Sequence, residues 1–510
     1  MRIAPTENAG SVPEPYEREH LANVAPSGWE NTTPSSPYDL LIIGAGPAGL
    51  VAARAAKALG ANVALIERHL LGGNCLNYGC VPSKAIIRTS RLYADMRTAA
   101  NLGAETPADL RVDFSAAMAR MRRIRTRISR VDSAARLVAQ GIDLHFGSAR
   151  FVAADTVDVG GVRLRFRKAL IATGSRPMLP TLPGLAEAGF LTNESVFDLT
   201  AQPRSLLVIG GGPLGCELAQ AFARFGTRTV IAHREPLFLP KEERDAAQMV
   251  SDALARDGVE IHLNSTAVGV RVEGGRKLVE LVNDGNTATV AVDEILTGIG
   301  RIPAVLGLNL EAAGVTYDAD AGVHADDLLR TSNSRIYAAG DVCLEHPFTN
   351  TADASARIAV RNALLPGRAR MSALTIPWCT YTDPEIAHVG IYVRQARERN
   401  IAVKTFTVPM HDVDRAIADG EEDGFVKIHI RDGTDTILGA TIVSRDAGEM
   451  INSISLAMVA GIGLRTLAGV IHAYPTQGEA IRQAADAYTR TRPSLLVGWL
   501  QRTWMKRFNR

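Results

Sequence analysis

Apolar and polar positions follow the same order in two separate stretches of the chain. Each stretch has a short apolar strand, a G-x-G-x-x-G turn, a helix and a second apolar strand. The strands span 38–43 and 62–66 in the first stretch, and 205–209 and 227–232 in the second. A glycine-rich turn between a strand and a helix lets a pyrophosphate approach the helix N-terminus. The pattern therefore predicts two Rossmann-like dinucleotide-binding units.

The residue that follows the second strand differs between the two units. Glu67 lies eighteen residues after Gly49 in the first unit, and His233 lies eighteen residues after Gly215 in the second. An acid at this position hydrogen-bonds ribose hydroxyls, whereas a cationic neighbour such as Arg234 accommodates a 2′-phosphate. We therefore expect the second nucleotide to be NADPH rather than NADH.

Two further patterns lie between the nucleotide-binding units. Residues 114–140 predict one long helix, packed through Ile124, Ile128 and Val131, and alternating residues at 143–169 predict a β-meander. The arginines of the predicted helix fall all around it rather than on one stripe. This distribution favours a solvated helix over a nucleic-acid-binding one.

The composition is that of an ordinary globular protein. At 510 residues we expect about three domains, with 46% hydrophobic and 22% charged residues. The net charge of +2 gives no overall attraction to nucleic acid or to a membrane. Five cysteines form no secreted-type framework, and no apolar signal core or uncharged run of eighteen apolar residues is present. We expect a cytoplasmic protein.

One stretch concentrates the candidate chemistry. Cys75 and Cys80 are five positions apart, and Val81-Pro82 is expected to open a helix, which places Cys80 at a helix N-terminus. The helix dipole there favours a thiolate, and Cys75 lies within reach for a disulfide. The glycines before Cys75 let the backbone pass close to a flat cofactor, and Lys84 returns to the face of Cys80 one turn later. A redox-active disulfide beside a flavin fits this pattern.

The segment Cys75-x₄-Cys80-Val81-Pro82-Ser83-Lys84 resembles the active-site signature of the class I FAD-dependent pyridine nucleotide–disulfide oxidoreductases. Dihydrolipoamide dehydrogenase, glutathione reductase and mercuric reductase belong to this family. The resemblance extends from about Tyr38 to Tyr488. It implies an enzyme that uses FAD and NAD(P)H and works as a homodimer with its active site shared across the interface.

The resemblance also implies individual roles. Cys80 would be the inner thiolate facing the flavin and Cys75 the outer, attacking thiol, while Lys84 and Glu217 would form an ion pair beside flavin N5. Asp341 would bind the ribityl chain. We expect no resident metal ion. The predicted cofactor-binding residues are Gly44, Gly46, Gly49, Glu67, Gly73, Lys84, Thr173, Gly174, Gly210, Gly212, Gly215, His233, Arg234, Gly300, Gly340 and Asp341.

The chain departs from the family at the segment that supplies the catalytic base. Lipoamide dehydrogenase and glutathione reductase have His-Pro-Thr there, with an acid five residues after the histidine. This chain keeps the acid as Glu479 but has Tyr474 in place of the histidine, and His472 comes two residues too early. A tyrosine hydroxyl does not titrate near neutrality, so Tyr474 is a poor general base. We expect Tyr474 and Glu479 to line the pocket over Cys75 of the partner subunit.

This departure makes a mercuric reductase-like activity on Hg(II) or a related thiol-linked substrate the leading hypothesis. A disulfide substrate needs a proton for its leaving thiolate, whereas a soft metal ion held between thiolates does not. The chain nevertheless lacks a cysteine after Cys379 and an N-terminal Cys-x-x-Cys domain, both of which mercuric reductases use to deliver the metal. The alternatives are a dihydrolipoamide dehydrogenase-like or other small-disulfide reductase, and a membrane-peripheral flavin electron-transfer protein.

We expect an α/β protein with two Rossmann-like domains, the second inserted in the first, and a C-terminal α+β dimerisation domain. Six prolines and five glutamates at the N-terminus predict a flexible arm, and basic and aromatic residues at the C-terminus allow peripheral membrane contact. The predicted parts are the flexible arm, 1–37; the FAD-binding domain, 38–187 and 304–370; the NAD(P)H-binding domain, 188–303; the dimerisation domain, 371–490; and the basic aromatic tail, 491–510.

Overall fold

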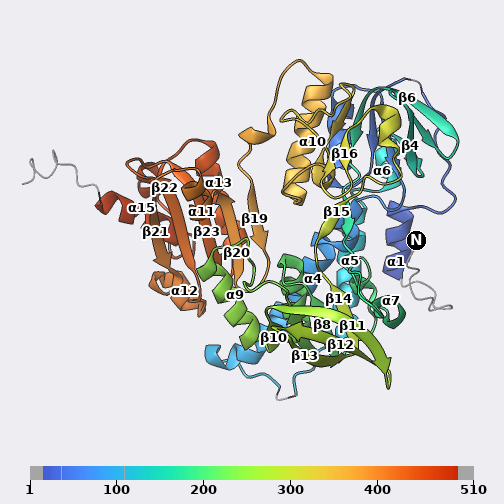
Figure 1. Cartoon of the computed structure of the whole chain (residues 1–510). Helices are drawn as coiled ribbons and strands as arrows, with labels where there is room; N and C mark the ends of the chain where they lie inside the picture. Colours follow the sequence, from blue (N-terminus) through green and yellow to red (C-terminus); the bar gives the residue numbers. More distant parts are fainter. Residues whose placement is uncertain (1–14, 36, 108, 492–510) are drawn as a thin grey trace, which may run out of the picture. The chain divides into compact units, whose positions relative to one another are not determined.

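The computed structural model describes residues 15–35, 37–107 and 109–491 (Figure 1). The chain forms two compact units. We call residues 1–236 and 258–374 the nucleotide unit, and residues 237–257 and 375–510 the C-terminal unit. The predicted tail, apart from residue 491, lies outside the described residues.

The first part of the nucleotide unit is built on a seven-stranded sheet. Its central strands are continuous apolar runs buried on both faces, as parallel strands between helix layers usually are. Strand β18 comes from the far end of the unit and adds to β6, so the second nucleotide-binding part is inserted between them. The strands are β1 (Tyr38–Ile43), β2 (Val63–Glu67), β3 (Asp143–Phe146), β4 (Ala149–Ala153), β5 (Thr156–Val159), β6 (Val162–Ile171) and β18 (Ile336–Ala338).

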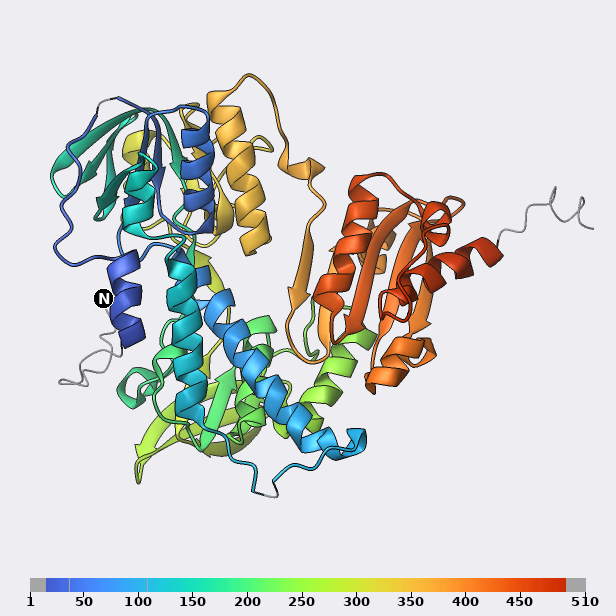
Figure 2. The ribbon, with the colours of Figure 1, turned by 180° about the vertical axis from the view of Figure 1, so that it is seen from behind.

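Helices cover this sheet. α2 and α10 pack against each other, and Figure 2 shows the same unit from behind. Pro47 opens α2 in the first turn, where a missing N–H costs nothing. The helices of this part are α1 (Pro15–Val24), α2 (Pro47–Ala58), α3 (Gly73–Tyr78), α4 (Cys80–Thr98), α5 (Phe114–Ser129), α6 (Ala134–Ala139) and α10 (Thr349–Leu364).

The inserted part repeats this architecture on a smaller scale. A four-stranded parallel sheet in the order β10-β9-β8-β14 is joined by an antiparallel three-stranded sheet, β11-β12-β13. A short ribbon of β7 and β15 connects the two nucleotide-binding parts. The elements are β7 (Ser175–Pro177), α7 (Leu185–Ala188), β8 (Ser205–Ile209), α8 (Pro213–Arg224), β9 (Arg228–Ala232), β10 (Val259–His262), β11 (Ser265–Glu273), β12 (Arg276–Asn283), β13 (Asn286–Val292), β14 (Glu294–Thr297) and β15 (Arg301–Pro303). Strands β16 (Tyr317–Asp318) and β17 (Gly322–Val323) follow the insertion and pack into the core of the first part.

The C-terminal unit has a five-stranded antiparallel sheet in the order β19-β20-β23-β22-β21. Helices α13 and α15 pack on this sheet and close an apolar core. The elements are α9 (Arg244–Arg256), β19 (Pro377–Thr380), β20 (Glu385–Gly390), α11 (Val393–Glu398), β21 (Val403–Pro409), α12 (Asp414–Asp419), β22 (Phe425–Arg431), β23 (Ile437–Ser444), α13 (Ala447–Val459), α14 (Leu464–Ala468) and α15 (Glu479–Arg490).

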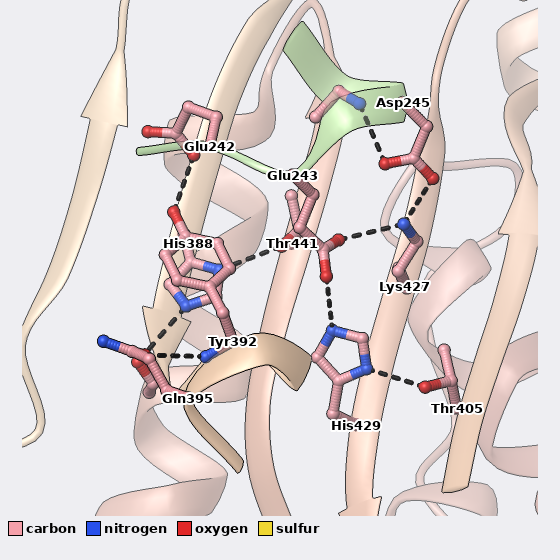
Figure 3. A network of polar contacts seen from close by, with 12 residues as sticks. Glu242, Glu243, Asp245, His388, Tyr392, Gln395, Thr405, Lys427, His429 and Thr441 are labelled. Carbon is pink, nitrogen blue, oxygen red and sulfur yellow. Dashed lines mark hydrogen bonds and ion pairs between the residues drawn. The ribbon is translucent and has the colours of Figure 1, made fainter. Parts of the chain in front are cut away.

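Helix α9 belongs to the C-terminal unit although its sequence lies within the predicted NAD(P)H-binding domain. A buried polar network holds it there (Figure 3). Glu243 accepts hydrogen bonds from Lys427 Nζ at 2.9 Å and from His429 Nε2 at 3.1 Å. Glu242 accepts one from the Tyr392 hydroxyl at 2.7 Å, and the Tyr392 ring stacks on His388. The other predicted domain boundaries remain predictions, because the split into two units does not distinguish them.

The predicted fold class agrees with this architecture, and two local predictions are wrong. The expected arm contains helix α1, which packs against α5, so residues 15–24 are not a flexible segment. The predicted long helix is two helices, α5 and α6, because Ser133 accepts a hydrogen bond from the Arg136 N–H and caps a new helix. Within the described part of the chain, the structure has no helix long and apolar enough to cross a membrane.

The packing of α5 also differs from the prediction. Ile128 and Val131 are exposed, whereas Arg125 is only 3% exposed. The buried side of α5 includes Met118 and Met121 instead. Apolar periodicity pointed to the wrong face because polar partners on α1 and α3 cover Arg125.

Candidate functional site

The cysteine segment, residues 72–84, folds into the end-to-end helices α3 and α4, with Gly79 between them. Its first helical residue, Gly73, has a φ of +56°, and a Cβ there would lie 2.7 Å from Gly46 Cα. Only glycine permits both the backbone conformation and this close approach. The cysteine segment therefore lies directly against the first G-x-G-x-x-G turn.

The two cysteines are not joined by a disulfide bond in this structure, and the electrostatics of each side chain are affected mainly by the other. The hydrogen-bond donor Cys75 lowers the pKa of Cys80, whose side chain is exposed, to about 6, with help from the positive charge of Lys84 and against the effect of desolvation. The same hydrogen bond, with burial, raises the pKa of Cys75. Thr349 Oγ1 lies 3.6 Å from Cys80 Sγ. In the reduced pair, these effects favour the thiolate at Cys80 and the thiol at Cys75.

Lys84 and Glu217 are brought together from distant parts of the nucleotide unit. Lys84 Nζ donates a hydrogen bond to Glu217 Oε2 at 2.7 Å, and the Glu217 side chain is only 4% exposed. Lys84 lies on α4, one turn after Cys80, and Glu217 lies on α8, just after the second glycine-rich turn. The ion pair therefore joins the cysteine segment to the inserted nucleotide-binding part.

Strand register collects the predicted FAD-binding residues at one edge of the large sheet. Ile171 at the end of β6 pairs with Ile43 of β1 and Ala338 of β18. Because all three strands are parallel, the segments that follow them meet at their carboxyl ends, where open α/β sheets bind ligands. These segments carry Gly44, Gly46 and Gly49; Thr173 and Gly174; and Gly340 and Asp341.

Polar groups at this edge fit a bound flavin nucleotide. The Oγ1 atoms of Thr173 and Thr351 are buried, and neither has a hydrogen-bond partner among the described residues. Buried hydroxyl groups are normally paired, so both are available to a ligand. Asp341 accepts a hydrogen bond from Ser175 Oγ at 2.6 Å, and Arg301 Nε donates to the same Oγ at 2.8 Å. The residues present are therefore compatible with FAD.

The two glycine-rich turns are stabilised in the same way by different side chains. Glu67 Oε2 accepts a hydrogen bond from the Ala45 N–H at 2.7 Å, and His233 Nδ1 accepts one from the Gly211 N–H at 3.2 Å. Ala45 and Gly211 occupy the same position in their G-x-G-x-x-G turns. Glu67 and His233 are thus structurally equivalent, as their spacing in the sequence predicted.

The inserted turn lacks an acidic side chain at the position equivalent to Glu67. His233 has its ring against the turn, and Arg234 follows it with a side chain that is 79% exposed. Arg234 Nε donates a hydrogen bond to Glu235 Oε1 at 2.9 Å. Gly210, with a φ of +111°, packs against Gly298, so Gly300 lies just beyond the same turn.

Tyr474, Glu479 and His472 lie in the C-terminal unit. The Tyr474 side chain is 69% exposed, and its hydroxyl donates a hydrogen bond to Asp414 Oδ2 at 2.7 Å. This hydrogen bond raises the pKa of Tyr474, so even less of the hydroxyl is ionised near neutral pH and available as a general base. Glu479 accepts a hydrogen bond from Arg482 Nη2 at 2.6 Å, and His472 is half-buried. Their predicted place over Cys75 depends on a second subunit.

Sequence reasoning missed several polar residues that lie within the cysteine segment or contact it. Thr349 and Asn77 are polar residues without a distinctive motif, and Arg125 is one of many arginines on its helix. The neighbouring small polar residues Thr126 and Ser129 on α5 could have indicated that this side of the helix, including Arg125, makes polar contacts with another helix. Asp414, the partner of Tyr474, had no signal in the sequence.

Two family descriptions match the chain. "Pyridine nucleotide-disulphide oxidoreductase" matches residues 38–363, and the "dimerisation domain" of the same group matches residues 376–485. A mercuric reductase of Lysinibacillus sphaericus is 34% identical over 469 residues, which cover 92% of this chain and 85% of that protein. A dihydrolipoyl dehydrogenase of Bacillus subtilis (strain 168) is 34% identical over 454 residues, which cover 88% of this chain and 96% of that protein.

Solved structures also resemble the chain. The HOCl-induced flavoprotein disulfide reductase RclA of Escherichia coli matches with a TM-score of 0.79 and 28% identity, over 88% of this chain and 99% of that one. LpdA of Mycobacterium tuberculosis matches with a TM-score of 0.81 and 28% identity, again over 88% and 99% of the two chains. A further structure of the E. coli protein is a Cu(II) complex, with a TM-score of 0.79 and 27% identity over 89% of this chain and 100% of that one.

Proposed function

Because the chain belongs to the pyridine nucleotide–disulphide oxidoreductase family, we propose that it is a mercuric reductase-like enzyme that reduces Hg(II), or a related thiol-linked substrate, with electrons from NADPH. The chain is a FAD-dependent oxidoreductase that uses NAD(P)H, and its C-terminal domain is a dimerisation domain that supports a homodimer. The substrate, the preference for NADPH and the residue roles below are parts of the proposal.

The observation that carries this proposal is the side chain at position 474. A reductase of small disulfides needs a group that protonates the leaving thiolate near neutral pH. Tyr474 has a pKa raised above its usual value by the Asp414 carboxylate, so it holds its proton throughout the neutral range. A metal ion leaves its thiolate ligands without taking a proton, so its reduction does not need this group.

In this proposal, bound FAD would accept a hydride from the nicotinamide and pass two electrons to the Cys75–Cys80 disulfide. Lys84 keeps a positive charge beside the cysteines, and Glu217 orients its ammonium group. When the disulfide opens, Cys80 holds the negative charge and Cys75 the proton. Cys75 then loses its proton on binding the metal. Overall, NADPH and Hg(II) give NADP⁺, Hg(0) and one proton.

The proposal places the metal on the cysteine pair alone. Among residues 15–491 that the structure describes, no group of three or more His, Cys, Asp or Glu side chains is arranged to hold a metal ion. Soft thiolate ligands suit a soft metal ion. The Cu(II) complex of the E. coli structural relative supports metal binding on a chain of this fold.

A small-disulfide reductase is the second candidate, favoured by the dihydrolipoyl dehydrogenase relative with 34% identity. The proposed membrane contact of the tail rests on residues 492–510, which lie outside the described part of the chain. Liposome co-sedimentation with and without residues 493–510 tests that contact.

The test is NADPH oxidation by the purified flavoprotein, with Hg(II), lipoamide, oxidised glutathione and quinones as separate acceptors. We expect Hg(II)-dependent turnover that is lost in Cys75→Ala. The matched variant Tyr474→His restores an imidazole at the base position, and we expect it to increase the reduction of lipoamide but not of Hg(II). Efficient lipoamide reduction by the wild-type protein, without Hg(II) turnover, would contradict the proposal.

A further inference from the structure

Helix α1 lies outside both segments that match the family, which begin at residue 38 and end at residue 485. It nevertheless packs closely against α5 of the nucleotide unit (Figures 1 and 2). Thr126 Oγ1 donates a hydrogen bond to the Tyr16 carbonyl at 2.8 Å, and Asn23 Nδ2 donates one to Ser129 Oγ at 3.0 Å. The helix is therefore a docked part of this unit.

One face of α1 contacts the cysteine segment itself. His20 Nε2 lies 2.8 Å from Asn77 Oδ1, and the Val24 carbonyl accepts a hydrogen bond from the Leu71 N–H at 3.0 Å. His20 is 1% exposed, and Asn77 and Val24 are fully buried. Asn77 lies on α3, two residues after Cys75 and three before Cys80. The contact thus reaches the helix that carries one of the two cysteines.

The surrounding hydrogen bonds fix the direction of the His20–Asn77 bond. Asn77 Nδ2 donates to the carbonyl groups of Leu71, at 3.0 Å, and Gly73, at 2.8 Å. Because both amide hydrogens are used, Asn77 Oδ1 faces His20 as an acceptor, and His20 Nε2 must carry the proton. Asn77, near the end of α3, therefore bonds both to the start of α3 and to His20 of α1.

The charged groups around His20 keep it neutral. Burial lowers the pKa of His20, and the positive charge of Arg125 lowers it further, against the opposing effects of Glu17 and Asn77. His20 Nδ1 is buried and has no hydrogen-bond partner among the described residues, so a proton there would gain no acceptor. Arg125 also donates a hydrogen bond from Nη1 to the Asn77 carbonyl at 3.2 Å and forms an ion pair with Glu17.

We propose that α1 is a positioning element of the redox centre, in which the hydrogen bond from His20 to Asn77 holds α3 so that the Cys75 thiol faces Cys80. His20 touches neither cysteine and acts through Asn77. The inference rests on the proposed redox role of the cysteine pair but not on the identity of the substrate.

The consequence concerns the hydrogen bond between the two thiols. That hydrogen bond is the largest cause of the low pKa of Cys80. If α3 loses its anchor on α1, Cys75 no longer stays aligned with Cys80, and the Cys80 thiolate loses its donor. Misplacement of a reacting group by about 1 Å can lower a rate by about a hundredfold.

The test compares full-length holoenzymes that carry single substitutions on α1. His20→Ala removes the donor, and His20→Phe does the same while keeping a ring in the buried site, in case the smaller side chain prevents folding. His20→Gln supplies an amide donor and is the rescue variant. Asn23→Ala is the matched control, because Asn23 lies on the same helix and binds α5 without touching α3.

Two readouts separate positioning from a general loss of structure. The first is the pH profile of Cys80 alkylation in the reduced protein, and the second is the division of the kinetic effect between kcat and the KM for NADPH. We expect His20→Ala and His20→Phe to shift the Cys80 midpoint upward by about one pH unit, a tenfold loss of thiolate, and to lower kcat with the KM for NADPH unchanged. We expect Asn23→Ala to match the wild type and His20→Gln to recover most of the effect.

The inference is overturned if His20→Phe leaves both readouts at their wild-type values, or if Asn23→Ala changes them as much as His20→Phe does. The alkylation profile requires no substrate. A wild-type protein that fails to oxidise NADPH with Hg(II) but shows a low Cys80 midpoint, shifted by His20→Phe, would contradict the proposed substrate and support the role of α1.

Discussion

Replacing Cys75 by alanine should raise the pKa of Cys80 substantially. The pKa of Cys80 is lowered to about 6 from an ordinary value of 9.0. The hydrogen bond from the Cys75 thiol is the largest cause, and the charge of Lys84 and the hydroxyl of Thr349 also contribute.

The size of the change follows from the kind of hydrogen bond that is lost. A hydrogen bond to a charged group contributes about 1.5–3 kcal/mol, which is about one to two pH units. Lys84 and Thr349 remain in Cys75→Ala. We therefore expect Cys80 to titrate at about pH 7–8 in this variant, still below a free thiol.

The assay is the rate of iodoacetamide alkylation of Cys80 as a function of pH, followed by mass spectrometry of the Cys80 peptide. Reading a single peptide keeps the other thiols from contributing to the profile. Cys75→Ser is the matched control, because its hydroxyl keeps a donor beside Cys80, and we expect its midpoint to lie below that of Cys75→Ala. If both variants keep a midpoint near 6, the thiol hydrogen bond does not explain the low pKa, and the reasoning is refuted.

Three further predictions follow from other contacts. Glu217→Gln should lower the free energy of unfolding by about 1–3 kcal/mol, because Lys84 loses its buried partner while keeping partial contact with solvent. Urea unfolding of the holoenzyme measures the change, and an unchanged unfolding midpoint contradicts the prediction. Arg234→Ala should lower kcat/KM for NADPH by about tenfold or more and leave that for NADH nearly unchanged, since a charge-assisted bond to the 2′-phosphate is lost; equal losses with both nucleotides contradict the predicted site. The C-terminal unit should lose stability as the pH falls from about 6.5 to 2, for two reasons. Burial lowers the pKa of His388 to about 3, so below pH 6.5 the unfolded form takes up a proton that the folded form does not. The bonds of Glu243 to His429 and Lys427 outweigh its burial and lower its pKa to about 2, so its contribution to stability is present above about pH 4.5 and lost below it. Thermal unfolding across this range measures the loss, which should be smaller in Glu243→Gln below pH 4.5.

The parts of the site that sequence reasoning located are those whose chemistry depends on spacing along one element. Cys80 follows a glycine and precedes Val81-Pro82, so its place at a helix start could be read directly from the chain. The two glycine-rich turns repeat with equal spacing, and that repeat led correctly to the equivalence of Glu67 and His233. The pairing of Lys84 with Glu217 spans distant segments and came from the family resemblance alone.

The parts that were missed depend on contacts between polar groups far apart in the chain. The N-terminal segment has too few apolar residues for a composition rule to predict packing, yet α1 docks through hydrogen bonds and an ion pair with α5 and α3. The burial of Arg125 depends on the same partners. Likewise, Glu242 and Glu243, which lie just before α9, bond to Tyr392 and His429 of the C-terminal unit, and such contacts between distant polar residues leave no periodic pattern in the sequence.

These polar contacts bear on why the redox centre of this chain differs from a bare cysteine pair. Cys75 is the largest cause of the low pKa of Cys80, so its position matters, and a six-residue helix such as α3 is too short to hold its own shape in water. Asn77 ties α3 to Leu71 and Gly73, and the partner that satisfies the remaining Asn77 oxygen is His20. The conformation of the reactive segment is therefore completed by a residue that lies before the family match begins at residue 38. An isolated 38–491 fragment would expose the Asn77 amide and leave the orientation of Cys75 to the contact of Arg125 on α5 with the Asn77 carbonyl.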